Sequence, residues 1–186
     1  MQFIFETVRL SVRKLALSDF ESFHKMQSNY KVMQYVRAKP MTFDENQSEL
    51  EKLVLSYELP DNDFWIYAIE RKVDSAFVGT IALVKDDSHE KVYEKDEWTI
   101  LNIKKDGCEI GYRFLEIFWG NGYGYEVVCG LVQHCRQLGF TQLIANVVKK
   151  NKASTRIIEK VGFVFVTDFV SDDLKLAECK FILQLR

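Results

Sequence analysis

Three closely spaced glycines stand where the sequence passes from a polar–apolar alternation into an amphipathic helix. The stretch CEIGYRFLEIFWGNGYGYEVVCGLVQHC, residues 108–135, contains Gly120, Gly122 and Gly124. Glycine costs a helix about 1 kcal/mol relative to alanine, but it lets the backbone adopt positive φ and approach a ligand closely. The unpaired amides and the dipole of a helix start attract anions, most often phosphate. The stretch therefore favours an anion site, and a turn that only redirects the chain is the alternative interpretation.

The spacing of these glycines excludes two common nucleotide-binding motifs. A P-loop requires GxxxxGK[ST], and the sequence contains no such string. The dinucleotide fingerprint requires GxGxxG or a terminal alanine, whereas the glycines here follow GxGxG and Tyr125 occupies the final position. No acidic residue ends a predicted strand about 20 residues later, as that fingerprint also requires.

The elements that must position this turn describe one α/β domain with a mixed sheet. We expect strands over 8–16, 64–72, 76–86, a segment ending near Phe114, 142–148, 163–170 and 177–185. We expect helices after an N-cap at Ser18, over 42–57, from about Gly122 to Leu138, and within 151–163, where Gly162 ends the last one. The strands at 64–72 and 76–86 are expected to form an antiparallel hairpin. The charged segment 87–107 is expected to be a solvated loop, and a further strand or an extension of the hairpin at EWTILNI, residues 97–103, is the alternative.

Composition narrows the functional classes further. The chain has 186 residues, 47% of them hydrophobic, which suits a single domain over residues 1–186. A net charge of −2 gives no electrostatic case for nucleic acid or an anionic membrane. The four cysteines form no CxxC pair, so we expect reduced cysteines and no metal site. No signal peptide or membrane span is predicted, so we expect a cytoplasmic protein.

The glycine turn resembles the pyrophosphate loop of the GNAT acyltransferase superfamily, [QR]-x-x-G-x-[GA], with Trp119 in place of Gln or Arg. That departure is typical of the RimJ/RimL-type branch, the N-terminal acetyltransferases of ribosomal proteins, which carry strings such as EIGYWL…WGxGYATEA. A second signature of the branch, N-x-x-S-x-x-x-x-E-K-x-G-F, is similar to residues 151–163. The resemblance is strong over 109–163, and the opening RLSVRKLALSDF, residues 9–20, is also similar.

The resemblance implies the GNAT acyl-CoA N-acyltransferase fold, a mixed and mostly antiparallel sheet with splayed central strands, flanked by helices. It implies an N-acetyltransferase that transfers the acetyl group of acetyl-CoA by direct attack of a primary amine, on a protein N-terminus or a small molecule. A homodimer is compatible with it. By resemblance, the cofactor-binding residues are Trp119, Gly120, Asn121, Gly122, Tyr123, Gly124 and Tyr125 at the pyrophosphate, backbone groups of Tyr112, Arg113 and Phe114 at the pantetheine arm, and Asn151 on the opposite wall.

The same resemblance suggests Glu109 as the proton acceptor and Ser154 as the proton donor. A surface carboxylate and a helix-start serine are the alternative interpretations of these residues. Some members of the superfamily carry a base at the position of Asn146, and many carry a tyrosine acid at that of Ile158; neither residue here can serve. A catalytically silent acyl-CoA-binding module of the same fold therefore remains the alternative function.

Overall fold

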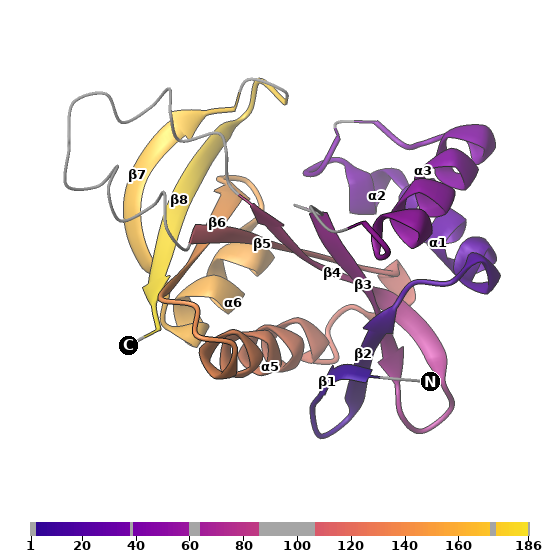
Figure 1. Ribbon diagram of the computed structural model, residues 1–186. Helices are drawn as coiled ribbons and strands as arrows, with labels where there is room; N and C mark the ends of the chain where they lie inside the picture. Colours follow the sequence, from indigo (N-terminus) through magenta and orange to yellow (C-terminus); the bar gives the residue numbers. More distant parts are fainter. Residues whose placement is uncertain (1–2, 38, 60–63, 86–106, 172–173, 186) are drawn as a thin grey trace.

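A computed structural model describes residues 3–37, 39–59, 64–85, 107–171 and 174–185 (Figure 1). The strands are β1 (Phe3–Glu6), β2 (Leu10–Lys14), β3 (Phe64–Arg71), β4 (Ala76–Lys85), β5 (Gly107–Phe114), β6 (Gln142–Val148), β7 (Val164–Val170) and β8 (Ala177–Gln184). The α-helices are α1 (Phe20–Gln27), α2 (Tyr30–Met33), α3 (Phe43–Ser56), α5 (Tyr123–Gln137) and α6 (Lys152–Val161), and the 3-10 helices are η1 (Leu17–Asp19) and η3 (Glu116–Phe118). Except for Gly107, the predicted loop at 87–107 lies outside the described residues.

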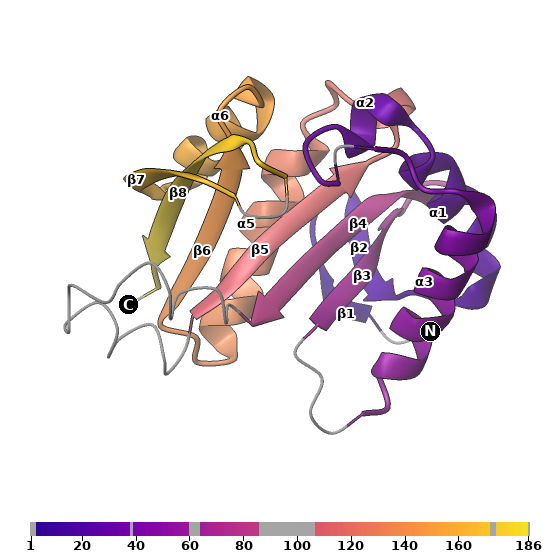
Figure 2. The same ribbon diagram turned by 90° about the horizontal axis from the view of Figure 1, so that it is seen from above.

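The strands form one sheet of eight in the order β1-β2-β3-β4-β5-β6-β8-β7. All neighbouring pairs in it are antiparallel except β5 and β6, which are parallel. This parallel pair keeps register only from Gly107 opposite Gln142 to Glu109 opposite Ile144, and then the two strands diverge (Figure 2). The predicted mixed sheet with splayed central strands is confirmed.

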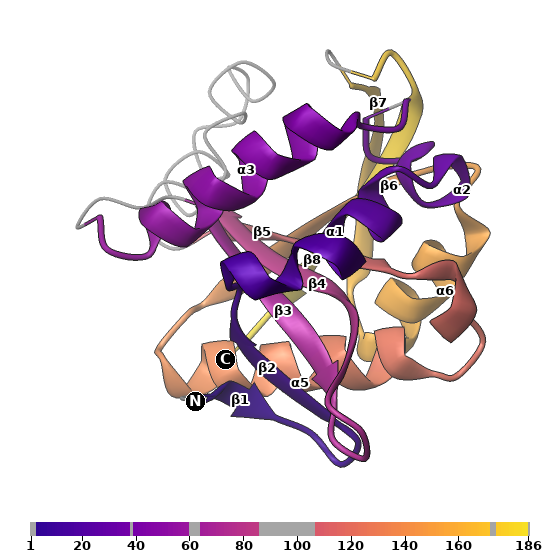
Figure 3. The ribbon, with the colours of Figure 1, turned by 90° about the vertical axis from the view of Figure 1, so that its right-hand side faces the viewer.

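Helices cover both faces of the sheet (Figure 3). One core lies between the sheet and α5 with α6, and it contains Val127, Val128 and Leu131 of α5, the helix that the sequence predicts to be amphipathic. A second core joins the other face to α1, α2 and α3, through residues such as Phe23 and Leu50. The prediction that α5 extends to Leu138 is wrong by one residue, because the helix ends at Gln137 and the Leu138 side chain is 61% exposed.

The N-terminal third departs most from the sequence prediction. The expected strand at 8–16 is confirmed as the shorter strand β2. The strand β1, which was not predicted, pairs with it in a hairpin whose Thr7 amide donates to Leu10 O at 2.8 Å. The short helix α2 was not predicted; Asn29 caps it by accepting from the Lys31 amide. The predicted helix at 42–57 is confirmed, with Thr42 and Glu45 forming a capping box.

Ser18 was expected to cap α1, and this prediction is wrong because Ser18 lies inside η1. The adjacent Asp19 takes the structural role, accepting from the Ala16 amide at 2.8 Å and from both terminal nitrogens of Arg13 at 2.8 Å. Arg13 also pairs with Glu70 of β3 at 2.8 Å. These buried charges fix the approach of α1 to the sheet, since a buried ion that loses its partner is strongly destabilising.

Two composition-based expectations concern the whole chain. The four cysteines are free: Cys135 is buried, and the other three are half-buried. Among the helices that the structure describes, none is long and apolar enough to cross a membrane.

Candidate active site

The parting of β5 and β6 opens a cleft in the middle of the sheet. The start of α5 and the start of α6 line one side of it, and residues of α2 and α3 line the other. The closed end is where Glu109 and Ile144 are still paired, and α5 begins at the open end. The fold thus places the two sequence motifs, 109–126 and 151–163, on one cleft.

The turn before α5 lines this cleft. Gly120 has a φ of 76° and Gly122, the N-cap, a φ of 77°, which are values that only glycine adopts readily. The first helical hydrogen bond runs from the Glu126 amide to Gly122 O at 3.2 Å, so the preceding amides lie ahead of the helical ladder. A Cβ at Gly120 would meet no atom within 4 Å, which leaves that backbone open to a ligand.

Gly124 differs from the other two glycines of the turn. It lies in the first turn of α5, and a Cβ there would stand 2.8 Å from Cδ1 of Ile157 on α6. Contacts that short are essentially never seen for a real Cβ. The absence of a side chain at Gly124 therefore lets α5 and α6 pack closely, in addition to any contact with a ligand.

Two side chains of the WGNGYG segment, those of Trp119 and Asn121, stabilise the turn by hydrogen bonds to its backbone and to the end of β5. The indole nitrogen of Trp119 donates to Phe114 O at 3.0 Å, which ties the turn to the end of β5. The Asn121 side chain donates to Phe118 O at 3.1 Å and to Trp119 O at 3.2 Å. Asn121 is thus the one predicted cofactor-binding residue that does not line the cleft, and its side chain stabilises the turn itself.

Glu126 connects the start of α5 to the β1–β2 hairpin. Its Oε1 accepts from Thr7 Oγ1 and from the Arg9 amide, and its Oε2 accepts from Arg9 Nε, each at 2.7 Å. Burial opposes ionisation of this carboxylate, but these hydrogen bonds and the Arg9 charge prevail and lower the pKa of Glu126. The Arg9 guanidinium also lies over the Tyr123 ring, 4.7 Å from its centroid. The N-terminal hairpin therefore supports the turn from outside the cleft.

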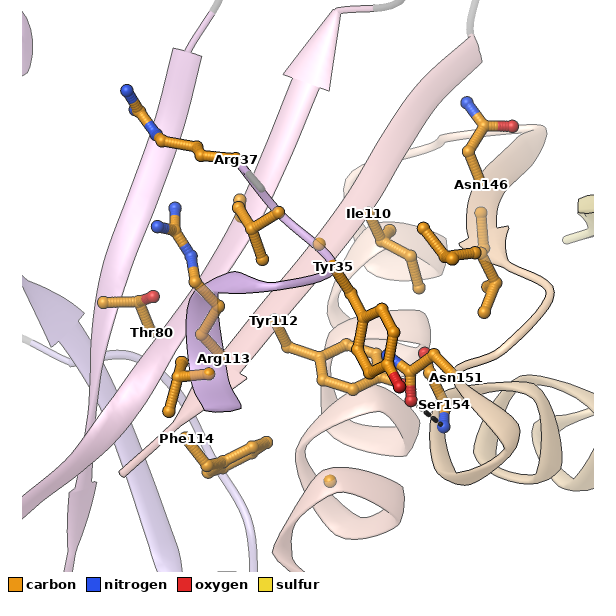
Figure 4. Close-up of a pocket in the computed structure, with 18 of the residues that line it drawn as sticks. Tyr35, Arg37, Thr80, Ile110, Tyr112, Arg113, Phe114, Asn146, Asn151 and Ser154 are labelled. Carbon is orange, nitrogen blue, oxygen red and sulfur yellow. Dashed lines mark hydrogen bonds between the residues drawn. The ribbon is translucent and has the colours of Figure 1, made fainter. Parts of the chain in front are cut away.

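The even-numbered residues of β5 point toward α5 and α6. Ile110 is buried there, and Tyr112 and Phe114 pack against the same core (Figure 4). The Tyr112 hydroxyl lies 2.9 Å from Ser154 Oγ, and either can donate. Burial raises the pKa of Tyr112 to about 12, so the phenol keeps its proton at neutral pH. Asn151 caps α6 by accepting from the Ser154 amide at 3.2 Å.

The odd-numbered residues of β5 point toward α1, α2 and α3. They are Glu109, Gly111 and Arg113, two charged residues separated by a glycine. Asn146 of β6 donates through Nδ2 to Glu109 Oε2 at 2.9 Å, which orients the carboxylate. The Oδ1 atom of Asn146 is buried and has no hydrogen-bond partner in the part of the chain that the structure describes.

The structure gathers the other predicted site residues around the cleft. It also brings in groups that the sequence motifs did not identify: the amide of Asn146, the hydroxyl of Tyr112 and the guanidinium of Arg113. Alternation along β5 is the signal that could have found the last of these, because it separates Arg113 from Tyr112 onto opposite faces. Within the described residues, no three His, Cys, Asp or Glu side chains converge as metal ligands.

Comparisons with known proteins agree with this geometry. A family profile described as "Acetyltransferase (GNAT) domain" matches residues 9–164. The uncharacterized N-acetyltransferase YoaA of Bacillus subtilis (strain 168) is 28% identical over 162 residues, which cover 86% of this chain and 82% of that protein.

Two solved structures share the fold at low sequence identity. Spermidine N-acetyltransferase from Vibrio cholerae, in complex with CoA and spermine, has a TM-score of 0.74 and 16% identity, covering 95% of this chain and 96% of that one. RimL, a ribosomal L7/L12 alpha-N-protein acetyltransferase in complex with CoA, has a TM-score of 0.76 and 14% identity, covering 98% of each chain. With the profile spanning most of the sequence and the splayed strands in place, the chain belongs to the GNAT acetyltransferase family and is an acetyl-CoA-dependent acetyltransferase.

Proposed function

We propose that the acetyl acceptor is a primary amine, acetylated by direct attack within the cleft between β5 and β6. The observation that carries this proposal is the position of Glu109. Its carboxylate lies where the two strands part, and the cleft opens from there toward the start of α5. The base at the closed end suits the amine, and the anion site at the open end suits the pyrophosphate of acetyl-CoA. The two substrates would then meet between these ends.

The residues around the turn fit the donor. The amides from Gly120 to Tyr125 would hold the pyrophosphate, since Gly120 and Gly122 open that backbone and the helix dipole favours negative charge. The Trp119 amide already donates to Glu116 O at 3.1 Å, so Trp119 would contribute only through its side chain or its carbonyl. The backbone of Tyr112, Arg113 and Phe114 lies beyond the part of β5 that pairs with β6 and would hold the pantetheine arm, with Asn151 opposite. Acetyl-CoA supplies the acetyl group as a thioester, and CoA leaves as the thiol.

Glu109 would accept the proton that the amine loses as its nitrogen bonds to the acetyl carbon. The unpaired Oδ1 of Asn146 is a hydrogen-bond acceptor beside it, suited to orient an N–H of the same amine. Asn146 cannot act as a base, but its side-chain amide orients the carboxylate of Glu109. Across the cleft, Ser154 would donate a proton to the departing sulfur and regain one from water, and the protonated Tyr112 hydroxyl holds its Oγ in place.

The energetics of deprotonation favour a weakly basic amine. A model α-amine has a pKa of about 8 and a lysine side chain about 10.4. Forming the neutral amine at pH 7 therefore costs about 1.4 kcal/mol for the first and about 4 to 5 kcal/mol for the second. A site with a single candidate base therefore suits the less basic amine, such as the α-amine of a protein N-terminus or a small-molecule amine of similar pKa. A RimJ/RimL-type acceptor, a homodimer and a cytoplasmic location remain predictions.

The test combines thiol release from acetyl-CoA with mass spectrometry of the acceptor. Peptides with varied N-termini and a panel of small amines, polyamines included, are incubated with the protein. We expect amine-dependent thiol release and a product heavier by one acetyl group on nitrogen. Ser154→Ala should lower turnover while CoA affinity, measured by calorimetric titration, stays the same. Tight CoA binding with no amine-dependent release from any acceptor would instead support the catalytically silent module.

A further inference from the structure

Arg113 places a positive charge deep in the acceptor side of the cleft with only neutral partners. Its Nη1 donates to Oε1 of the fully buried Gln27 and lies 4.0 Å from the Met33 sulfur. In the part of the chain that the structure describes, no carboxylate pairs with this guanidinium. A guanidinium has five donors, so most of them remain for a ligand. The side chain is half-buried and lines the cleft.

The neighbouring charges do not neutralise Arg113. Glu49 of α3 is the nearest acid whose charge Arg113 feels, and its Oε1 is already paired with Arg37 at 3.0 Å. Two arginines and one glutamate leave a local net charge of about +1 at this place. The next charges that line the cleft are Glu109, which faces the amine in the proposed reaction, and the buried Glu178 and Lys180 of β8, whose opposite charges offset each other. Removal from water disfavours such a charge and lowers the pKa of Arg113 to about 10, which still leaves it ionised at pH 7.

Nearby charges farther out do not change this balance. Lys31 is paired with Glu116, and Asp44, Glu45 and Lys52 are exposed to solvent, where their fields are screened. An uncompensated cation in a cleft is costly unless a ligand supplies the opposite charge. We expect the acceptor to be that ligand, because Glu109, the proposed base for its amine, lies on the same face of β5 as Arg113.

The alternation of β5 gives the acceptor a direction. Glu109, Gly111 and Arg113 share one face, and Gly111 leaves that face open between the carboxylate and the guanidinium. Residues two apart on a strand are separated by about 7 Å. An amine that reacts beside Gly111 and Glu109 would therefore reach Arg113 only with a group several bonds away from its nitrogen.

We propose that the acceptor is a primary amine that carries a carboxylate several bonds from the amine, and that Arg113, held by Gln27, binds this carboxylate. The inference rests on the proposed amine acetylation. A carboxylate suits the site better than a phosphate monoester, because the net charge of about +1 matches a single negative charge and Glu49 repels a second. The same cation disfavours polyamines as acceptors.

The experiment compares matched acceptors that differ only at the far end. ω-Amino acids from glycine to 6-aminohexanoate are each paired with the corresponding carboxamide, and kcat/KM is measured for both members of each pair. We expect the longer acids to be preferred over their amides by about 10- to 100-fold, the range of a charge-assisted hydrogen bond. For glycine the amide should be preferred, because the carboxylate lies too close to the amine to reach Arg113 and makes that amine more basic than the amine of glycinamide.

Two variants separate binding by Arg113 from a structural role. Arg113→Gln should bring the acid-to-amide ratio close to one. Glu49→Gln should raise the ratio by several fold, because it removes the negative charge beside Arg113. A structural role would give no reason for opposite changes in this ratio. If Arg113→Gln fails to fold, as judged by thermal melting, Arg113→Lys should still keep a reduced preference for the acid.

Several outcomes would overturn the inference: equal rates for acids and amides, an unchanged ratio in Arg113→Gln, or polyamines as the best acceptors. If a phosphate-bearing amine such as phosphoethanolamine is preferred over every amino acid tested, the site does not select a group with a single negative charge. Calorimetric titration of 6-aminohexanoate and its amide, in the presence of CoA, tests the same preference without turnover. Loss of the proposed function would show as no acetylation of any amine, whereas failure of this inference alone would show as acetylation that ignores the carboxylate.

Discussion

The two sides of the cleft are built in different ways. On the α5–α6 side, the residues of β5 are apolar or aromatic, and the turn before α5 is held by Trp119, Asn121 and Glu126. On the α1–α3 side, β5 presents Glu109, an open glycine and Arg113, whose described partners are few. The first side is fixed by packing and backbone geometry, and the second carries charges that a ligand can complete. Donor binding and protonation of the departing sulfur should therefore depend on the first side, and acceptor choice and deprotonation of the amine on the second.

The largest expected effect tests the charged side. Glu109→Gln keeps the size of the side chain but removes the proton acceptor, so we expect kcat to fall by about 10²- to 10⁴-fold. CoA affinity should stay unchanged. Glu116→Gln is the matched control, because Glu116 is a carboxylate on η3 paired with Lys31 and Asn29. If the Glu109→Gln variant keeps wild-type turnover, Glu109 is not the proton acceptor, and the α1–α3 side does not supply the base.

The next effect belongs to the α5 side. Gly122→Asp introduces a carboxylate and a strained positive φ at the helix start, so CoA affinity should fall by about 10- to 100-fold, as measured by calorimetric titration. Gly139→Asp is the control, since Gly139 has a φ of 85° at the far end of α5, outside the cleft. If both variants bind CoA equally well, the turn does not hold the diphosphate.

The sequence predicted the α5 side better than the α1–α3 side, and the reason is the range of the interactions. The glycine turn, the α5 helix and the end of α6 at Gly162 depend on residues within a few positions of each other, so local rules identify them. Glu109 was identified from a motif, but its contact with Asn146 joins residues 37 apart, and that of Arg113 with Gln27 joins residues 86 apart. Pairings of this length follow from the sheet order, which no local pattern contains.

The N-terminal hairpin illustrates the same limit. Its link to the cofactor-side turn, from Thr7 and Arg9 to Glu126, spans 119 and 117 residues. Both residues lie in the turn between β1 and β2, and β1 was not predicted. The prediction of Ser18 as a cap rests on the frequency of serine at that position. In the structure Asp19 instead accepts the hydrogen bonds before α1, because it also pairs with the buried guanidinium of Arg13.

Glu126→Gln should have a smaller effect, on stability instead of turnover. Loss of the charge weakens the bonds from Thr7 and Arg9, and we expect the free energy of unfolding to fall by about 1 kcal/mol at pH 7. The pKa of Glu126 is lowered in the folded state, so this stabilisation is present above the unfolded value of about 4.3 and disappears as the pH falls through the folded pKa. Urea unfolding should therefore give a difference that shrinks below about pH 4. A constant difference at all pH values would exclude the charge as its cause.

The smallest effect separates the two reasons for glycine in the turn. Gly124→Ala should change stability by less than about 1 kcal/mol, because the gain in helix propensity is offset by the approach of the new Cβ to Ile157 Cδ1. Ile157→Val removes that atom, so Gly124→Ala should be more favourable in this background than in the wild type, a positive coupling in a double-mutant cycle measured by urea unfolding. Both alanine variants keep the backbone amide and should bind CoA normally. If CoA affinity falls even when Ile157 is valine, the ligand requires the glycine, and the α5 side serves the donor through Gly124 as well as through Gly122.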